Sequence, residues 1–191
     1  MTAQRQTHHH LFDTALGRCG VAWNARGLCA VQLPDRTPAA TERRLVAKAG
    51  STAAVPPPWV AAPVADIRRY LAGERVDFAA VAVDLDSLEP FQQKLYAALR
   101  AVPFGATTTY GELAKTLGLP GWEGARDVGA AMGQNPVPIV IPCHRVLAAG
   151  GRLGGFSAPG GSATKARLLA LEGVKLSAAP AAAAIPRLPG L

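Results

Sequence analysis

Near the start of the chain, hydrophobic and polar residues alternate in short runs, which is the pattern of β-strands. Residues 10–14, 19–23 and 28–33 are strand-like. Gly17 and the segment 24–27 separate these runs with residues that favour turns. The spacing predicts a hairpin that continues into a third strand, and hence a small antiparallel sheet.

The next stretch mixes polar, helical and strand-like patterns. Residues 34–58 are polar and rich in Ala and Pro, which predicts an irregular connection. Apolar residues at helical spacing within 64–71 predict a short helix that ends at Gly73. Residues 78–85 form another strand-like run. We therefore expect residues 1–86 to form a small domain of mixed helix and strand.

Helical spacing dominates the second half of the chain. Pro90 suits the first position of a helix, and apolar residues follow at helical spacing. Thr109, with a glutamate three residues later, can cap a second helix. After a short Gly/Pro turn, a third helix covers residues 122–133. Two short helices joined in this way predict a helix-turn-helix within a C-terminal domain at residues 87–176.

One face of the third helix carries almost no side-chain bulk. Each glycine in a helix costs about 1 kcal/mol relative to alanine, so the glycines there need a reason. Either a bulky partner such as DNA approaches this face, which would place Gly129 and Ala130 at the interface, or another helix packs closely on it. The small residues concerned are Gly124, Ala125, Gly129, Ala130 and Ala131.

The final part of the chain predicts a buried strand, a loop, a helix and a tail. Residues 137–141 are apolar and predict a short buried strand. Residues 150–161 are rich in glycine and predict a loop. Ser162 can cap a last helix that ends at Gly173. The Ala/Pro composition of residues 177–191 predicts a disordered tail.

Composition excludes several classes of protein. The chain has 191 residues, 49% of them hydrophobic, and can bury a core. It has no apolar run of about 18 residues, so we expect no membrane span. The first residues lack the apolar stretch of a secretory signal. Three widely spaced cysteines favour a reducing cytoplasm over a disulfide framework.

Positive charge is concentrated toward the C-terminus. The net charge is +7. Residues 128–191 hold six Lys and Arg against one acid, Glu172, whereas residues 1–127 hold 14 against 12. This distribution favours a polyanion such as nucleic acid as partner. A solubilising surface would have the same composition, so charge alone leaves both interpretations open.

Cys143 stands among residues that can activate a thiol. His144 and Arg145 follow it and are basic neighbours of the kind that promote thiolate formation. Because adjacent residues of a strand point to opposite faces, Cys143 and His144 share a site only if Pro142 begins a turn or a water links them. Glu172 opposes the dipole of its helix, which a buried partner such as His144 would explain. Thiol, imidazole and carboxylate fit the roles of nucleophile, base and orienting group.

The sequence Ile141-Pro142-Cys143-His144-Arg145-Val146 resembles the active-site signature of the O6-alkylguanine-DNA alkyltransferases, also called methylated-DNA–protein-cysteine methyltransferases. The resemblance runs from Phe91 to Gly173 and is looser before it. It implies an α+β protein, with a small RNase H-like α/β domain at the N-terminus and a winged-helix-type DNA-binding domain at the C-terminus. Further matching segments, in the same order, are Tyr110-Gly111, Gly124-Ala125-Arg126, Gly133–Pro138, Gly155-Phe156-Ser157 and Leu169–Gly173.

This resemblance implies a role for each matching residue. Cys143 would accept the alkyl group of an O6-alkylguanine. His144, acting through a water and held by Glu172, would take the thiol proton. Asn135 would fix the turn between the recognition helix and the active-site segment. Tyr110 would donate a hydrogen bond to the guanine ring nitrogen that gains negative charge.

Other positions would contact the DNA and the flipped base. Arg126 would replace the flipped guanine in the base stack. Backbone groups at Cys143 and Val146 would accept from the exocyclic amine, and the Ser157 N–H would face O6. Asp127 and the loop extension Ala158-Pro159 depart from the family's usual pattern.

The resemblance also implies a single-turnover reaction on double-stranded DNA. A thioether is not a leaving group, so the protein would be consumed by its own reaction. The alkyl group and the thiol suffice, so no cofactor is expected, and nothing in the pattern points beyond a monomer. Some relatives hold a zinc ion near the N-terminus, but Cys19, Cys29 and the histidines at 8–10 lack the close cysteine spacing of a structural zinc site, and we predict no metal.

Two other classes of protein share some of these features. A DNA-binding module without chemistry, such as a damage sensor, would have the helix-turn-helix but no use for Cys143. Methyl transfer onto the protein would exclude it. A cysteine hydrolase would use the same Cys, His and Glu, but would have no use for Arg126. Turnover of an ester or amide would favour the hydrolase.

Overall fold

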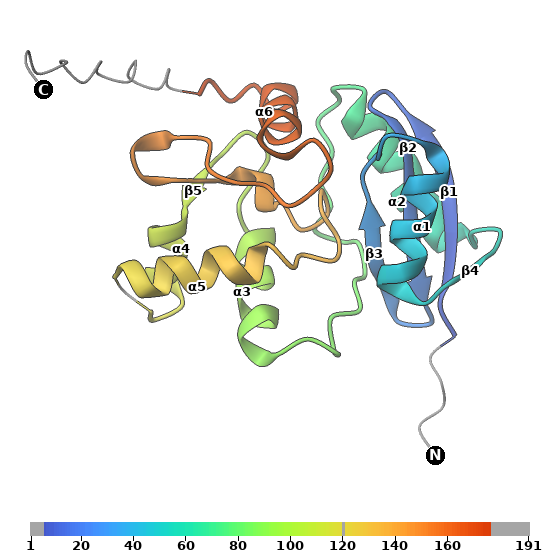
Figure 1. The fold of residues 1–191 in the computed structure, drawn as a ribbon, viewed down its shortest axis with the longest axis horizontal. Coiled ribbons are helices and arrows are strands. Elements are labelled where there is room, and N and C mark those ends of the chain that lie inside the picture. Colours follow the sequence, from blue (N-terminus) through green and yellow to red (C-terminus); the bar gives the residue numbers. More distant parts are fainter. Residues whose placement is uncertain (1–5, 120, 177–191) are drawn as a thin grey trace, which may run out of the picture.

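The computed structural model describes residues 6–119 and 121–176 and shows a sheet-containing half beside a helical half (Figure 1). The tail predicted at 177–191 lies outside the described residues. In chain order the elements are β1 (His8–Thr14), β2 (Gly17–Asn24), β3 (Gly27–Gln32), α1 (Pro38–Ala49), β4 (Thr52–Ala53), α2 (Pro58–Leu71), α3 (Pro90–Arg100), β5 (Thr108–Thr109), α4 (Tyr110–Thr116), α5 (Trp122–Met132), the 3₁₀ turn η1 (Cys143–Arg145), β6 (Val146–Leu147), the 3₁₀ turn η2 (Ala149–Gly151) and α6 (Gly161–Leu171).

The N-terminal sheet has the strand order β3-β2-β1-β4. β1 and β2 pair antiparallel down to Thr14 opposite Gly17, and β2 continues antiparallel into β3, which confirms the predicted hairpin and third strand. The Thr14 hydroxyl donates to the Gly17 carbonyl at 2.6 Å. Gly17 has φ of 119°, a conformation that glycine adopts readily at a turn. β4 adds two residues parallel to β1.

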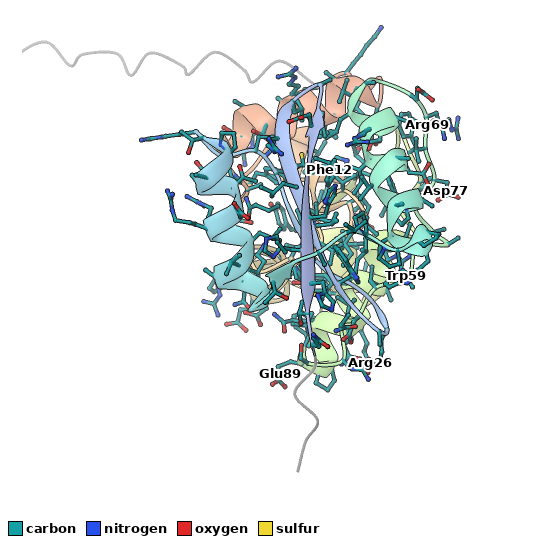
Figure 2. All side chains as sticks on the ribbon, turned by 90° about the vertical axis from the view of Figure 1, so that its right-hand side faces the viewer. Phe12, Arg26, Trp59, Arg69, Asp77 and Glu89 are labelled. Atoms are coloured by element: carbon teal, nitrogen blue, oxygen red, sulfur yellow. The ribbon has the colours of Figure 1, made fainter. Side chains whose placement is uncertain are left out.

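Two helices cover opposite faces of this sheet, as Figure 2 shows. α1 buries Leu45 against Ala22 and Ala30 in a small cluster. α2 buries a wider stripe, including Ile67 and Tyr70, in the main core. This main core continues into the helical half, so the two halves of the molecule pack on each other.

Helix α1 corrects the prediction that residues 34–58 form an irregular connection. The Thr37 hydroxyl accepts from the Ala40 N–H at 3.1 Å, and a proline occupies the first turn. Only Thr41 and Leu45 of this helix are buried. Because the buried stripe is so narrow, the hydrophobic pattern does not reveal the helix.

The prediction of a strand at residues 78–85 is also wrong. This segment forms one isolated bridge, with Val83 beside Leu28. Three of its carbonyl groups instead accept hydrogen bonds from the Arg100 guanidinium at 2.8 to 3.1 Å. A side chain from α3 thus satisfies backbone groups that a neighbouring strand would otherwise pair.

Helices α3, α4 and α5 occur where the pattern predicted them, and α4 and α5 form the helix-turn-helix. The Thr109 hydroxyl accepts from the Glu112 N–H at 3.1 Å at the start of α4. The Tyr96 hydroxyl of α3 donates to the Ala131 carbonyl of α5 at 2.8 Å. The first contact caps α4, and the second joins α3 to α5.

The small residues of α5 have two different environments. A Cβ on Gly124 would lie 1.8 Å from the Leu119 carbonyl oxygen, so glycine permits the tight connection between α4 and α5. A Cβ on Gly129 would meet the Tyr110 ring at 3.7 Å, an ordinary contact. Ala130 is exposed. Close packing therefore explains Gly124, whereas the surface at Ala130 is open to a partner.

The buried run at 137–141 is a turn and not the predicted strand. Ile139 has φ of 75°, which is unusual for a β-branched residue. Pro138 cannot donate to a strand partner. The Val31 N–H of β3 donates to the Pro136 carbonyl at 2.9 Å, which ties this turn to the N-terminal sheet.

Helix α6 is capped by Gly160, not by Ser162 as predicted. Gly160 has φ of 81°, a left-handed conformation that suits glycine at the entry to the helix. The helix ends just before Gly173, as predicted. Among the described helices, which leave out residues 1–5, 120 and 177–191, none is long and apolar enough to cross a bilayer.

Candidate active site

A single 3₁₀ turn, η1, carries Cys143, His144 and Arg145. The Cys143 N–H donates to the Ile141 carbonyl at 2.8 Å, and the Arg145 N–H donates to the Pro142 carbonyl at 2.9 Å. Pro142 thus begins a turn, which is one of the two arrangements that the sequence allowed for a site shared by Cys143 and His144. All three side chains of the turn are buried.

The Cys143 thiol accepts a hydrogen bond from Asn135. The Nδ2 of Asn135 lies 3.1 Å from Sγ and 2.9 Å from the Ile141 carbonyl oxygen, while its Oδ1 accepts from the Val137 N–H at 3.0 Å. Burial raises the pKa of the thiol, and the bond from Asn135 and the Lys165 ammonium act in the opposite direction. Asn135 therefore both braces the segment before Cys143 and favours a thiolate there.

Glu172 is the centre of a buried hydrogen-bond network next to His144. Its Oε1 lies 2.7 Å from His144 Nε2 and 2.7 Å from the Tyr70 hydroxyl. Arg145 donates to both carboxylate oxygens at 2.9 to 3.1 Å, and the Gly105 N–H donates to Oε2 at 3.0 Å. The Glu172 side chain has no exposed surface. This number of hydrogen-bond donors indicates that the Glu172 carboxylate is ionised.

The charges of this network follow from burial and from the partners. Burial alone would raise the pKa of Glu172, but the hydrogen bonds from His144 and Arg145 outweigh it and lower the pKa to about 2. Burial lowers the pKa of His144, against the attraction of Glu172. The imidazole is therefore neutral at physiological pH, and its bond to the carboxylate assigns the proton to Nε2. Within residues 6–119 and 121–176, the buried Nδ1 has no hydrogen-bond partner, so its lone pair can take a proton.

Arg145 pairs with Glu172, whereas the sequence predicted it as an activating neighbour of the thiol. Its guanidinium also donates to the Val102 carbonyl at 2.5 Å, in the segment after α3. The Arg145 side chain is 8% exposed, so the ion pair is almost fully removed from water. Its effect falls on the carboxylate, which it keeps ionised.

Lys165 of α6 is one of the cations whose charge bears on the thiol. It is fully buried, and its Nζ donates to the Val146 carbonyl at 2.5 Å and to the Gly155 carbonyl at 3.2 Å. Burial lowers the pKa of Lys165 to about 8, against the attraction of Cys143. The two backbone bonds hold the ammonium between β6 and the glycine-rich loop.

A cavity of about 240 Å³ opens beside Cys143. Pairing of β5 with β6, with Thr108 beside Val146, brings the start of α4 next to the end of η1. Tyr110 is thereby held at the cavity wall. Burial raises the pKa of Tyr110, so its hydroxyl stays protonated and can donate. The cavity is lined by Tyr110, Gly129, Met132, Gly133, Cys143, Gly155, Phe156 and Ser157.

Arg126 lies on the outer face of α5 together with Trp122. The guanidinium carbon is 5.0 Å from the centre of the Trp122 ring, and Nε is 3.7 Å from Oδ1 of Asp127. Trp122 is 69% exposed, which is unusual for so large an apolar side chain. This face therefore presents a cation stacked on an aromatic ring directly to solvent.

Within residues 6–119 and 121–176, no three His, Cys, Asp or Glu side chains are grouped so that they could hold a metal ion. Cys19 lies in the main core, and Cys29 lies beside the small cluster under α1. His9 contacts Glu42 at 3.3 Å and Ser51 at 3.0 Å. The histidines and cysteines considered for zinc are thus spread over both faces of the sheet.

Two family models match consecutive parts of the chain. Residues 7–85 match "6-O-methylguanine DNA methyltransferase, ribonuclease-like domain", and residues 90–174 match "6-O-methylguanine DNA methyltransferase, DNA binding domain". The chain belongs to the 6-O-methylguanine DNA methyltransferase family. This membership confirms the resemblance carried by the sequence around Cys143, and with it the α+β fold class.

Other members of the family show how far the similarity extends. The crystal structure of Mycobacterium tuberculosis OGT in complex with DNA has a TM-score of 0.69 and 34% identity, over 86% of this chain and 92% of that chain. The methylated-DNA–protein-cysteine methyltransferase of Mycolicibacterium paratuberculosis is 46% identical over 109 residues, which cover 57% of this chain and 62% of the relative. The DNA base-flipping protein of Thermus thermophilus is 43% identical over 107 residues, 56% of this chain and 69% of that protein. The match to the M. paratuberculosis protein therefore spans less than two thirds of its length.

The structure adds three residues that sequence reasoning missed in this family member. Tyr70 is 74 positions from His144 and 102 from Glu172, so no local pattern links them. One available signal was a tyrosine within a predicted helix, because a buried tyrosine hydroxyl usually has a partner. Lys165 and Trp122 carried no such signal, since only the fold buries the first and exposes the second.

Proposed function

We propose that this protein repairs alkylated DNA directly, by transferring the alkyl group of an O6-alkylguanine in duplex DNA to Cys143. The observation that carries the proposal is the surroundings of the thiol. Asn135 donates to Sγ, and a neutral His144 held by Glu172 shares the same turn. A cavity opens directly beside this thiol. Nucleophile, base and binding space therefore adjoin one another.

Duplex DNA is the proposed partner, bound through the helix-turn-helix. The M. tuberculosis protein of similar fold was solved in complex with DNA, and the net charge of +7 supports the same kind of partner here. We place the face of α5 around Gly129 and Ala130 against the minor groove, where small residues allow close approach. Arg126 then enters the stack in place of the flipped guanine, with Trp122 holding its guanidinium in position.

The transfer is one in-line displacement at the carbon attached to O6. His144 Nδ1 takes the Cys143 proton through a water, and Glu172 holds the imidazole in the required tautomer. Sγ bonds to the alkyl carbon as the bond from that carbon to O6 breaks. The Tyr110 hydroxyl donates to the guanine ring nitrogen that gains negative charge, and this bond strengthens toward the transition state.

Two backbone groups complete the recognition of the base. The Val146 carbonyl accepts from the exocyclic amine and keeps its bond from Lys165, since a carbonyl oxygen has two lone pairs. The Ser157 N–H faces O6 from the cavity wall. Together they distinguish guanine by its amine and its oxygen.

The proposed reaction also defines how the protein is used. A thioether is not a leaving group, so each molecule reacts once and no cofactor takes part. We propose a monomer in the cytoplasm, where the three free cysteines would stay reduced. The N-terminal domain is proposed to span residues 1–86 and the alkyltransferase domain residues 87–176.

Intact-mass spectrometry tests the transfer. Incubation with a duplex oligonucleotide carrying one O6-methylguanine should add one CH₂ to each protein molecule, located at Cys143 by peptide mapping. Cys143→Ser should bind the same duplex and gain no mass. Cys29→Ser, which removes a thiol elsewhere in the chain, should react like the wild type. An unmodified wild-type protein, or many substrates processed per molecule, would refute the proposal.

A second candidate is a protein that flips and marks the damaged base without removing the alkyl group. The 43% identity to the Thermus thermophilus DNA base-flipping protein favours it. A thiol braced by Asn135 and flanked by a neutral imidazole has no use in such a protein. The same incubation separates the two, because a marker would bind the modified duplex tightly and gain no mass.

A further inference from the structure

A second cavity opens onto Cys143 from the side of the N-terminal sheet. It holds about 280 Å³ and shares Gly133, Cys143, Phe156 and Ser157 with the cavity proposed for the flipped base. Cys143 therefore lies where the two cavities meet. A substituent on the carbon that Sγ attacks sits at this junction, and the second cavity is the space into which it can extend.

The walls of this second cavity come from both halves of the molecule. One wall is formed by β3 and by α1, the helix that the hydrophobic pattern did not reveal. The opposite wall includes Ala158 and Pro159, the loop extension that departs from the usual family pattern. These two residues do not line the cavity proposed for the base. The extension therefore shapes the space beyond the reacting carbon and not the space for the guanine.

The lining of this cavity is cationic and includes no acid. Arg44 and Lys48 of α1 contribute the charges. Arg44 is already paired, with Nε 2.5 Å from Oδ2 of Asp35. Lys48 has no ion-pair or hydrogen-bond partner among residues 6–119 and 121–176. Its charge reaches the thiol, since Lys48 is among the cations that oppose the rise of the Cys143 pKa on burial.

We propose that this cavity holds the far end of the transferred alkyl group and that Lys48 makes it favour groups that end in a carboxylate. The inference rests on the proposed alkyl transfer and adds a substrate class to it. With O6-carboxymethylguanine, Sγ bonds to the methylene carbon, the bond from that carbon to O6 breaks, and the guanine leaves with a proton on its ring. The carboxylate stays on the methylene group, now attached to Cys143.

Electrostatics explains why a cation matters for this substrate. The carboxylate is one bond from the reacting carbon, so it repels the approaching thiolate. An ammonium in the adjoining cavity attracts both anions and offsets that repulsion. With a neutral substituent of the same size, the ammonium attracts only the thiolate. The ratio of the transfer rate of the charged substrate to that of the neutral one therefore measures the attraction between the cavity and the carboxylate.

The test compares duplexes that carry O6-carboxymethylguanine or its neutral analogue O6-carbamoylmethylguanine. Transfer rates onto Cys143 are measured by intact mass on quenched samples. Lys48→Gln should lower the ratio of carboxymethyl to carbamoylmethyl transfer about threefold to fivefold, the effect of a partly exposed ion pair. Lys48→Arg should keep the wild-type ratio. Arg44→Gln should have a smaller effect because Asp35 already neutralises that side chain.

A matched control and a change of salt complete the design. Arg43→Gln removes an exposed cation of α1 that does not line the cavity, and it should leave the ratio unchanged. The wild-type ratio should fall as salt rises, because the ammonium at the mouth is screened. If Lys48→Gln keeps the wild-type ratio of carboxymethyl to carbamoylmethyl transfer and still transfers methyl groups, this inference is overturned but the repair function is not. Absence of methyl transfer from O6-methylguanine in the wild type overturns the repair function itself.

Discussion

Replacing the buried carboxylate of Glu172 with an amide should remove much of the protein's stability. Glu172→Gln keeps the shape of the side chain but leaves the Arg145 guanidinium, 8% exposed, without a counter-charge. In Glu172→Gln one acceptor oxygen becomes an NH₂ group, which cannot accept a hydrogen bond. The donors that face it, from Tyr70 and His144 or from Gly105, then lose their acceptor. Breaking a buried ion pair costs about 3–5 kcal/mol, against a total stability of about 5–15 kcal/mol for a typical domain.

The pKa of Glu172 provides a second estimate of this magnitude. Folding lowers the pKa from 4.5 to about 2, which at about 1.4 kcal/mol per pH unit corresponds to about 3 kcal/mol. Because the folded pKa is the lower one, this stability is fully present above pH 4.5 and is lost as the pH falls toward 2. The stability difference between the wild type and Glu172→Gln should therefore shrink over the same interval.

Urea unfolding followed by tryptophan fluorescence, at neutral pH and near the acid limit, measures both effects. The control is Glu74→Gln, which breaks the surface pair with Arg69, whose two side chains are 53% and 54% exposed. This control should change the stability very little, because water screens an exposed ion pair. Two results would mean that the buried network does not stabilise the fold. One is a loss of unfolding free energy in Glu172→Gln that is no larger than the loss in Glu74→Gln. The other is a loss that stays the same in acid.

Four further substitutions test separate parts of the structure. Tyr70→Phe removes one donor to the buried carboxylate and should cost about 1–3 kcal/mol in urea unfolding. It should also slow alkyl transfer while DNA affinity in a gel shift stays the same. An unchanged transfer rate would show that the Tyr70 hydroxyl does not support His144 and Glu172 in the reaction. Arg126→Ala should slow transfer from a duplex about tenfold or more, since flipping a paired base costs a few kcal/mol, but should spare transfer from the free O6-alkylguanine base; equal losses would contradict its place in the stack. Gly124→Ala should destabilise by about 1–3 kcal/mol, because the new Cβ would lie 1.8 Å from the Leu119 carbonyl oxygen. Gly129→Ala has room and should stabilise α5 by up to about 1 kcal/mol, so equal melting temperatures for these two variants would exclude the close approach.

Features that depend on neighbouring residues could be predicted from the sequence. The β1–β2 hairpin and the helices α4 and α5 formed where alternation, capping and turn residues placed them. A turn at Pro142 was one of the two arrangements that would let Cys143 and His144 share a site, and it is present. Each of these features is decided within one or two turns of chain, where local propensities act.

Helix α1 and the segments 78–85 and 137–141 show where local patterns fail. α1 buries so little that its sequence does not look amphipathic. The other two segments have apolar patterns typical of strands, but each forms only an isolated bridge within residues 6–119 and 121–176. Arg100 satisfies the carbonyls of the first, and the second turns at Ile139. The competing interactions come from distant parts of the chain.

By itself, the sequence determined which reactive groups this protein has and which short elements carry them. Only the tertiary structure decided which of those groups meet. Tyr70, His144 and Glu172 converge from α2, η1 and the end of α6, and Lys48 lines the far side of Cys143 from α1. Such contacts need orientation to a fraction of an ångström and exclusion of water, and both arise from the packing of elements that no periodic pattern relates to each other.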